Sequence, residues 1–177
     1  MNSRILKPVG SFFESVIDRF ISVAGFLVFV QIPSFLVQYQ QRLGGHVDEL
    51  ARIIKSYKSA AAGNSRTVEE YIGLHLQSNV KEFVSTGKLM SENMERFTDL
   101  SAALKSLSES KGIIKLFHFI KNIDFDIFKA AFKNFVPAVS LSIDTLFYGI
   151  AGIIFFMTIY FVIKKSLLFI IRKIRIH

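Results

Sequence analysis

Two long runs without a charged residue constrain the fold of this chain more than any other feature. The first covers residues 20–37 and the second covers residues 145–163, which gives them 18 and 19 residues. A helix needs roughly 20 apolar residues to cross the hydrocarbon core of a bilayer. A soluble chain of 177 residues would have difficulty in burying two such helices on all sides. The two runs therefore predict two transmembrane helices.

The residues before the first run predict an amphipathic helix that continues into it. Apolar side chains recur there at helical spacing, at Val9, Phe12, Phe13, Val16, Ile17 and Phe20. We expect one long helix from residue 8 to about residue 43, kinked near Pro33, because a proline lacks the N–H group and its ring clashes with the preceding turn. No small-residue cleavage site follows the run, so we expect an uncleaved anchor.

The charge distribution predicts an orientation in the membrane. The chain carries 22 Lys and Arg against 14 Asp and Glu, and residues 143–177 hold five basic residues and one acidic residue. Basic residues next to a span favour the cytoplasmic side. Both termini are then cytoplasmic, and the middle segment is periplasmic in a bacterium. Basic residues also lie near the span ends of the middle segment, so a competing signal exists at Arg42, Arg52, Lys55, Lys129 and Lys133.

The middle segment, residues 38–142, predicts helices only, because it shows no sustained alternation of apolar and polar residues. We expect Gly44 and Gly45 to permit a sharp turn or a close backbone approach. Stretches of small and turn-forming residues at 59–65 and 108–112 then divide the segment. The expected helical pieces cover residues 46–58, 67–107 and 112–135.

The second piece carries half of a heptad pattern. Apolar residues recur every seven positions at Leu76, Phe83, Met90, Phe97 and Leu104, with a possible break at Gly87. A coiled coil needs a second apolar position in each heptad, and that position is poorly filled here. Two interpretations remain open: a helix that packs one stripe on its neighbours, or a self-associating coiled coil.

The third piece combines phenylalanine with lysine at helical spacing. Six phenylalanines lie between residues 117 and 135, interleaved with Lys115, Lys121, Lys129 and Lys133. Such a helix is typical of the membrane interface. It is equally suited to closing the small core of the middle domain, and we keep both interpretations.

The densest group of polar residues lies where the first run ends. Gln31, Gln38 and Arg42 share one face if the helix continues, and a polar side chain in a span usually bonds to a partner helix. We therefore expect a helix-docking surface, with no catalytic, cofactor-binding or metal-binding residue. Its candidate residues are Gln31, Gln38, Tyr39, Arg42, Gly44, Gly45, His46 and Glu49.

The segment from Gln31 to Glu49 resembles a family of small bacterial inner-membrane proteins with two spans. These proteins share the signature Q-x-P-x-F-x-x-Q-Y-x-Q-R-L-G-G-H-x-x-E and form a domain-of-unknown-function family. A looser similarity covers Phe135 to Leu141. The resemblance implies two spans, a helical middle segment and a bacterial membrane, and it implies no activity, cofactor or catalytic residue.

Several function classes find no support in the sequence. The chain has no cysteine, which excludes disulfides and thiolate metal sites. His46 and Glu49 form a single i, i+3 pair, which falls short of a helical metal motif. Nucleotide-binding and nucleophile motifs are absent. The basic residues cluster after a span instead of covering a folded face, so we expect no nucleic-acid partner.

The sequence thus predicts an all-α membrane protein in which two transmembrane helices flank a helical, partly amphipathic middle domain. The expected parts are an amphipathic N-terminal helix (1–19), a first span (20–37), an extramembrane domain (38–142), a second span (143–163) and a basic tail (164–177). We expect no enzyme and no cofactor. The expected partners are membrane lipid and, through the first span, a protein or a second copy. The expected function is an accessory or scaffold role in a bacterial envelope complex, with a homo-oligomeric pore or membrane-shaping assembly as the alternative.

Overall fold

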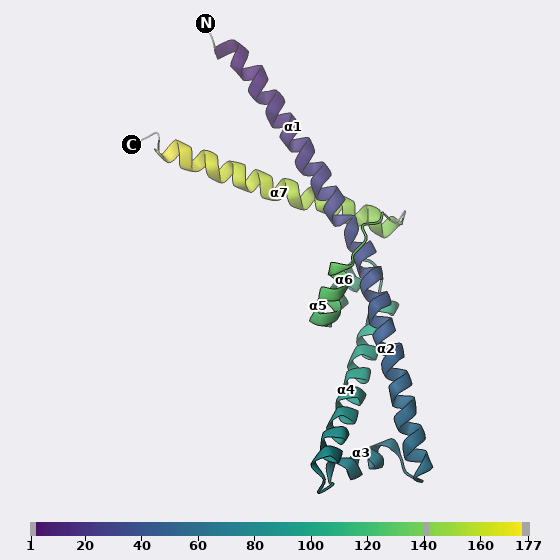
Figure 1. The fold of residues 1–177 in the computed structure, drawn as a ribbon. Helices are drawn as coiled ribbons and strands as arrows, with labels where there is room; N and C mark the ends of the chain where they lie inside the picture. The colour runs from purple at the N-terminus through teal and green to yellow at the C-terminus, as the bar shows by residue number, and fades with distance from the viewer. Residues whose placement is uncertain (1–2, 140–141, 175–177) are drawn as a thin grey trace. The chain divides into compact units, whose positions relative to one another are not determined.

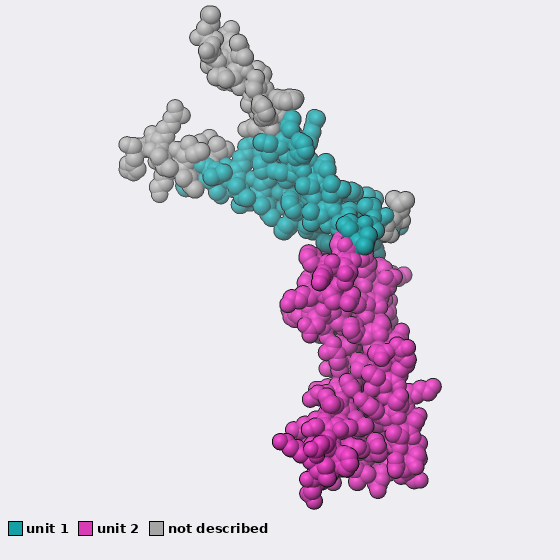
Figure 2. Space-filling model, in the orientation of Figure 1, with its two compact units in different colours: residues 1–35, 136–177 teal, residues 36–135 magenta. Residues whose placement is uncertain are grey.

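The computed structural model describes residues 3–139 and 142–174, with the side chains of residues 15–139, 142–167 and 169. These residues form helices and no strand, so the predicted all-α class is confirmed (Figure 1). The chain divides into two compact units, residues 1–35 with 136–177 and residues 36–135 (Figure 2). The helices are α1 (Ser3–Phe29), α2 (Gln31–Gly63), α3 (Val68–Leu76), α4 (Lys81–Glu109), α5 (Gly112–Lys121), α6 (Phe125–Lys133) and α7 (Ile143–Ile174).

The expected kink near Pro33 is present as a break between α1 and α2. Val30 is the only residue between the two helices, and its N–H group still bonds to the Phe26 carbonyl over 2.9 Å. Pro33 is the third residue of α2, where the missing N–H group costs nothing because the first turn of a helix has no intrahelical acceptor for it. Its ring would clash with the carbonyl four residues back, which explains why α1 ends at Phe29.

The expected turn at Gly44 and Gly45 is wrong. Helix α2 continues through both glycines to Gly63. The two glycines are also not needed for the close approach of a neighbouring helix. A Cβ on Gly44 would lie 4.0 Å from the Leu104 side chain, and a Cβ on Gly45 would meet nothing within 4 Å. The buried stripe of α2 stabilises the continuous helix more than two glycines weaken it, because glycine costs only about 1 kcal/mol per helical position.

The expected single helix over residues 67–107 is two helices. Helix α3 ends at Leu76, and α4 begins at Lys81. Thr67 and Glu70 form a reciprocal capping box at the start of α3. The seven-residue pattern therefore runs across two helices. Gly87 does not break α4 but permits the close packing of α3, because a Cβ there would lie 2.9 Å from the Leu76 nitrogen.

The expected third piece is also divided. Helix α5 ends at Lys121, and α6 begins at Phe125. Asp124 begins α6, because its carboxylate accepts hydrogen bonds from the N–H groups of Asp126 and Ile127.

In the first unit, α1 and α7 cross at glycines. A Cβ on Gly25 would lie 2.6 Å from the carbonyl oxygen of Gly152, and Gly149 receives the ring of Phe26. Close to this crossing, Phe29 packs on Phe155 with 5.5 Å between ring centroids. Small residues that let two backbones approach are typical of helix pairs in membranes.

Among the residues that the structure describes, two helical stretches are long and apolar enough to cross a membrane. They cover Ser15–Gly63, counted across the break at Val30, and Ile143–Leu167. The amphipathic pattern at Val9, Phe12 and Phe13 lies outside the side chains described. Of the expected basic tail, residues 164–174 continue α7 as helix.

The second unit has an apolar cluster at the α3 end. Ala61 of α2, Val68 and Ile72 of α3, and Met90 of α4 are buried together, and Tyr57, Tyr71 and Met94 pack against them. Helices α2 and α4 diverge towards α3, which lies between their far ends (Figure 1). Met90 of the heptad pattern thus belongs to the core of the chain itself.

Candidate functional site

Gln31 is the first of the predicted docking residues, and it makes a bond inside the first unit. Its side-chain oxygen accepts a hydrogen bond of 3.1 Å from the N–H group of Ala138. This bond joins the first turn of α2 to the segment that precedes α7. The partner of Gln31 is thus a backbone group of the irregular segment before α7, not a helix, and docking of Gln31 on a partner helix stays a prediction.

Tyr39 is fully buried in the second unit, where it holds the connection between α5 and α6. Its ring packs edge-to-face on Phe119 with centroids 4.9 Å apart, and its hydroxyl accepts a 3.0 Å hydrogen bond from the Asp124 N–H group. Burial raises the pKa of the Tyr39 phenol above its usual value. The Asp124 N–H bond opposes this pKa shift, whereas the Asp124 carboxylate reinforces it. The phenol therefore stays neutral and serves as a structural acceptor.

Asp124 links three elements, and it is not among the predicted site residues. One carboxylate oxygen accepts from the N–H groups of Asp126 and Ile127, at 3.0 and 2.9 Å. The other oxygen pairs with Arg96 of α4 at 3.4 Å. The signal that predicts this role is an aspartate directly before an amphipathic run, which is typical of a helix N-cap.

Gln40 makes a second connection between α2 and the start of α5. Its amide nitrogen donates to the Ser108 hydroxyl at 3.0 Å, and its amide oxygen accepts from the Lys115 ammonium group at 2.6 Å. Together with Tyr39, Gln40 fixes α5 beside the first turns of α2. Gln40 was not among the predicted docking residues.

The remaining predicted residues lie mostly on the surface of α2. Arg42, Gly45, His46 and Glu49 are exposed, and their spacing of three and four residues places them on one face, which we call the α2 stripe. Glu49 pairs with Arg52 on the same helix. Gln38 and Gly44 are partly buried. The predicted set thus separates into the inward residues Gln31 and Tyr39 and the outward α2 stripe.

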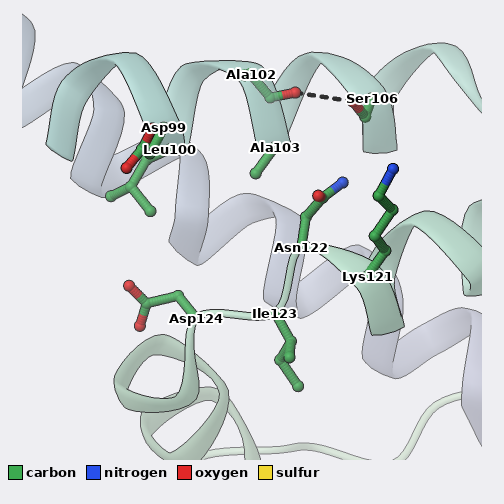
Figure 3. A pocket seen from close by; sticks show the side chains of 9 residues that line it. All are labelled: Asp99, Leu100, Ala102, Ala103, Ser106, Lys121, Asn122, Ile123 and Asp124. Carbon is green, nitrogen blue, oxygen red and sulfur yellow. Dashed lines mark hydrogen bonds between the residues drawn. The ribbon is translucent and has the colours of Figure 1, made fainter. Parts of the chain in front are cut away.

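An open cleft lies between α4 and the α5–α6 connection. Its larger part has a volume of about 450 Å³, with α4 on one side and residues 121–124 on the other (Figure 3). A neighbouring hollow of about 410 Å³ shares Asp99, Leu100 and Asp124 with it. Charges of both signs line the two parts, at Glu92, Glu95, Arg96, Asp99, Lys121 and Asp124. Over the part of the chain that the structure describes, no three His, Cys, Asp or Glu residues gather as a metal ion requires.

Comparison with curated proteins and with solved structures returns no match. A comparison with protein families does return one, and it covers residues 13–173, which include both apolar runs and the middle segment. The predicted membership of an uncharacterised family is thereby confirmed. The chain belongs to the family described as "Protein of unknown function (DUF2937)".

Proposed function

We propose that this protein is an integral membrane protein with two spans that serves as a non-enzymatic accessory or scaffold component of a bacterial envelope complex. The observation that carries the membrane location is the outward apolar surface of α1 and α7. Only 22% of the apolar segment within Ser15–Gly63 and 17% of the one within Ile143–Leu167 are buried within the protein, whereas a core helix of a soluble protein would be mostly buried. Phe20 on α1 and Phe147 on α7 are 72% and 67% exposed.

The proposed orientation is that both termini lie in the cytoplasm and the second unit lies in the periplasm. Its support is the group of basic residues at the end of α7, beginning with Lys164 and Lys165. The inner membrane of a bacterium is the compartment that fits two helical spans with this asymmetry.

The α2 stripe is the proposed docking surface for a protein partner. Arg42 and His46 make no hydrogen bond or ion pair with any residue that the structure describes, and both side chains are exposed. The stripe also belongs to the segment that carries the family resemblance. Side chains that the fold itself does not use are available for recognition.

Photo-crosslinking in living cells tests this proposal. A photoreactive amino acid is placed at Gln38 or at His46 of the full chain, and the adducts are identified by mass spectrometry. Lys55 is the matched control, because it is exposed on another face of α2. One heterologous protein captured from positions 38 and 46, but not from position 55, supports the accessory role. Capture of the same proteins in equal amounts from all three positions would contradict a defined docking surface.

The second candidate function is a homo-oligomeric membrane-shaping or pore-forming assembly. The observation that favours it is the exposed apolar surface of α5 and α6, where Ile113 is 76% and Phe125 is 73% exposed. Self-adducts as the main crosslinking product, together with dye release from liposomes that contain the purified protein, would support this function. Intact liposomes with self-adducts absent would contradict it.

A further inference from the structure

Helices α5 and α6 turn large apolar side chains away from the core of the second unit. We call these side chains the α5–α6 apolar face. Each of them is more than half exposed: Ile113, Ile114, Phe117 and Ile120 on α5, and Phe125 and Phe132 on α6. Soluble proteins rarely expose contiguous apolar patches of this kind without a partner surface.

The apolar face is additional to the side of each helix that packs inward. On α5, Phe119 is buried against Tyr39, while Ile113, Phe117 and Ile120 follow the helical spacing on the outer side. On α6, Ile127 and Ala131 are buried. Both helices are therefore apolar on two sides, and the core of the unit uses only one.

Lysines border the outer side of these helices. Lys121, Lys129 and Lys133 are exposed, and the segment from Gly112 to Lys133 holds four lysines against two aspartates. One of these aspartates, Asp124, is already paired with Arg96. Lysine stems lie along apolar surface while their ammonium groups reach outward, so this arrangement matches a layer of acyl chains below anionic headgroups.

Along the chain, α5 and α6 are tied closely to both apolar runs. Tyr39, which packs on Phe119 and bonds to Asp124, follows the end of the first apolar run at Val37 by two residues. Two residues of helix rise only about 3 Å. On the other side, α6 ends at Lys133, ten residues before α7 begins at Ile143, and ten residues span at most about 35 Å.

We infer that the α5–α6 apolar face inserts into the interfacial region of an anionic phospholipid bilayer, namely the membrane that α1 and α7 cross. This inference rests on the proposed two-span membrane location. The two spans anchor the chain, and the α5–α6 apolar face adds a contact in the plane of the surface. A second copy of the chain and a protein partner are the competing occupants, and the experiment below separates them from lipid.

Nitroxide labelling measures the surroundings of the apolar face directly. The chain has no cysteine, so each variant carries a single label: Phe117→Cys, Phe125→Cys, Phe155→Cys or Ser91→Cys. Phe155 is the lipid reference on α7, and Ser91 is the water reference on α4, since both side chains are exposed. The purified full chain is reconstituted into vesicles of phosphatidylcholine and phosphatidylglycerol. The relaxation of the nitroxide by oxygen then reports the exposure of the label to lipid, and its relaxation by a water-soluble nickel complex reports its exposure to water.

Labels at positions 117 and 125 are expected to resemble position 155, with several-fold more relaxation by oxygen relative to nickel than position 91. Water-like values at 117 and 125 with a lipid-like value at 155 would overturn the inference and leave the two-span proposal standing. Low exposure to both reagents at 117 and 125 would mean that protein covers the face, which also overturns it. A water-like value at 155 would contradict the two-span proposal itself.

A lysine variant tests the contribution of lipid charge. Lys121→Gln, Lys129→Gln and Lys133→Gln are combined, and the matched control combines Lys55→Gln, Lys58→Gln and Lys88→Gln, which are exposed elsewhere on the unit. The first triple variant is expected to lower the lipid exposure of a label at position 125, as is the removal of phosphatidylglycerol. The control triple variant is expected to leave it unchanged. Equal effects of the two variants would contradict specific recognition of the anionic surface.

Discussion

Gly25 of α1 faces Gly152 of α7 so closely that a methyl group on Gly25 would lie 2.6 Å from the Gly152 carbonyl oxygen. The obstacle is backbone, which cannot swing aside as the end of a flexible side chain can. Ser22 of α1 also donates a hydrogen bond to the sulfur of Met157 on α7, at 3.2 Å. The two helices therefore pack along a crossing that only small residues permit.

Gly25→Ala is expected to destabilise the α1–α7 pair by about 1–3 kcal/mol, because the added methyl group forces the two backbones apart. The measurement is unfolding of the purified protein in mixed micelles with increasing sodium dodecyl sulfate. Gly45→Ala is the control, since a Cβ there meets nothing within 4 Å. Equal stability of the Gly25→Ala protein and the unmodified chain would contradict this packing.

Gly87→Ala is expected to destabilise the second unit by about 1–3 kcal/mol, because the new Cβ would lie 2.9 Å from the Leu76 nitrogen and the His75 Cβ. Gly45→Ala is expected to stabilise the same unit by about 0.5–1 kcal/mol, since alanine is the better helix former. Circular dichroism during denaturant unfolding measures both changes. The test is that the two substitutions change the free energy of unfolding in opposite directions. Changes in the same direction would show that α3 does not pack on Gly87.

Tyr39→Phe is expected to destabilise the second unit by about 1–3 kcal/mol, because the Asp124 N–H group loses its acceptor at a buried site. Tyr57→Phe is the matched substitution. The Tyr57 hydroxyl accepts from the half-buried Asn93 side chain at 2.9 Å, and that amide can turn to water. We expect a smaller loss there, so equal losses in denaturant unfolding would contradict the role given to Tyr39.

A cysteine at Ser91 is expected to react with a membrane-impermeant thiol reagent in cells whose outer membrane alone is permeable. The reason is that the second unit is proposed to lie in the periplasm. Ser166→Cys, near the basic end of α7, is the control for the cytoplasmic side and is expected to stay unlabelled until the inner membrane is opened. Labelling at position 91 only after that step would reverse the orientation.

The sequence allowed the prediction of the helical class, of two helices long and apolar enough to cross a membrane, and of the break near Pro33, because each depends on local composition or on one residue. The turn expected at Gly44 and Gly45 failed because burial of Tyr39, Leu43 and Leu50 on one side of α2 outweighs the local preference of glycine. Tertiary packing of this kind is not visible in a window of a few residues.

The helix ends inside the middle segment were missed for a related reason. Leu76 and Phe83 continue the seven-residue pattern across the break between α3 and α4, so the periodicity conceals it. The partners of the candidate site were missed because they lie far along the chain. Tyr39 and Asp124 are separated by 85 positions, and Gln31 and Ala138 by 107. The spacing of residues in a sequence predicts contacts only between neighbours on the same helix.

The bond between Tyr39 and Asp124 also sets an order of assembly. A ribosome delivers residue 39 long before residue 124. While the first part of the chain emerges, the Tyr39 hydroxyl therefore lacks its donor, the Asp124 N–H group, and the Tyr39 ring is not yet covered by Phe119. The nascent chain must carry an uncovered aromatic ring just beyond its first apolar run until α5 and α6 have been made. Synthesis of the first apolar run is therefore complete before the second unit can close around Tyr39.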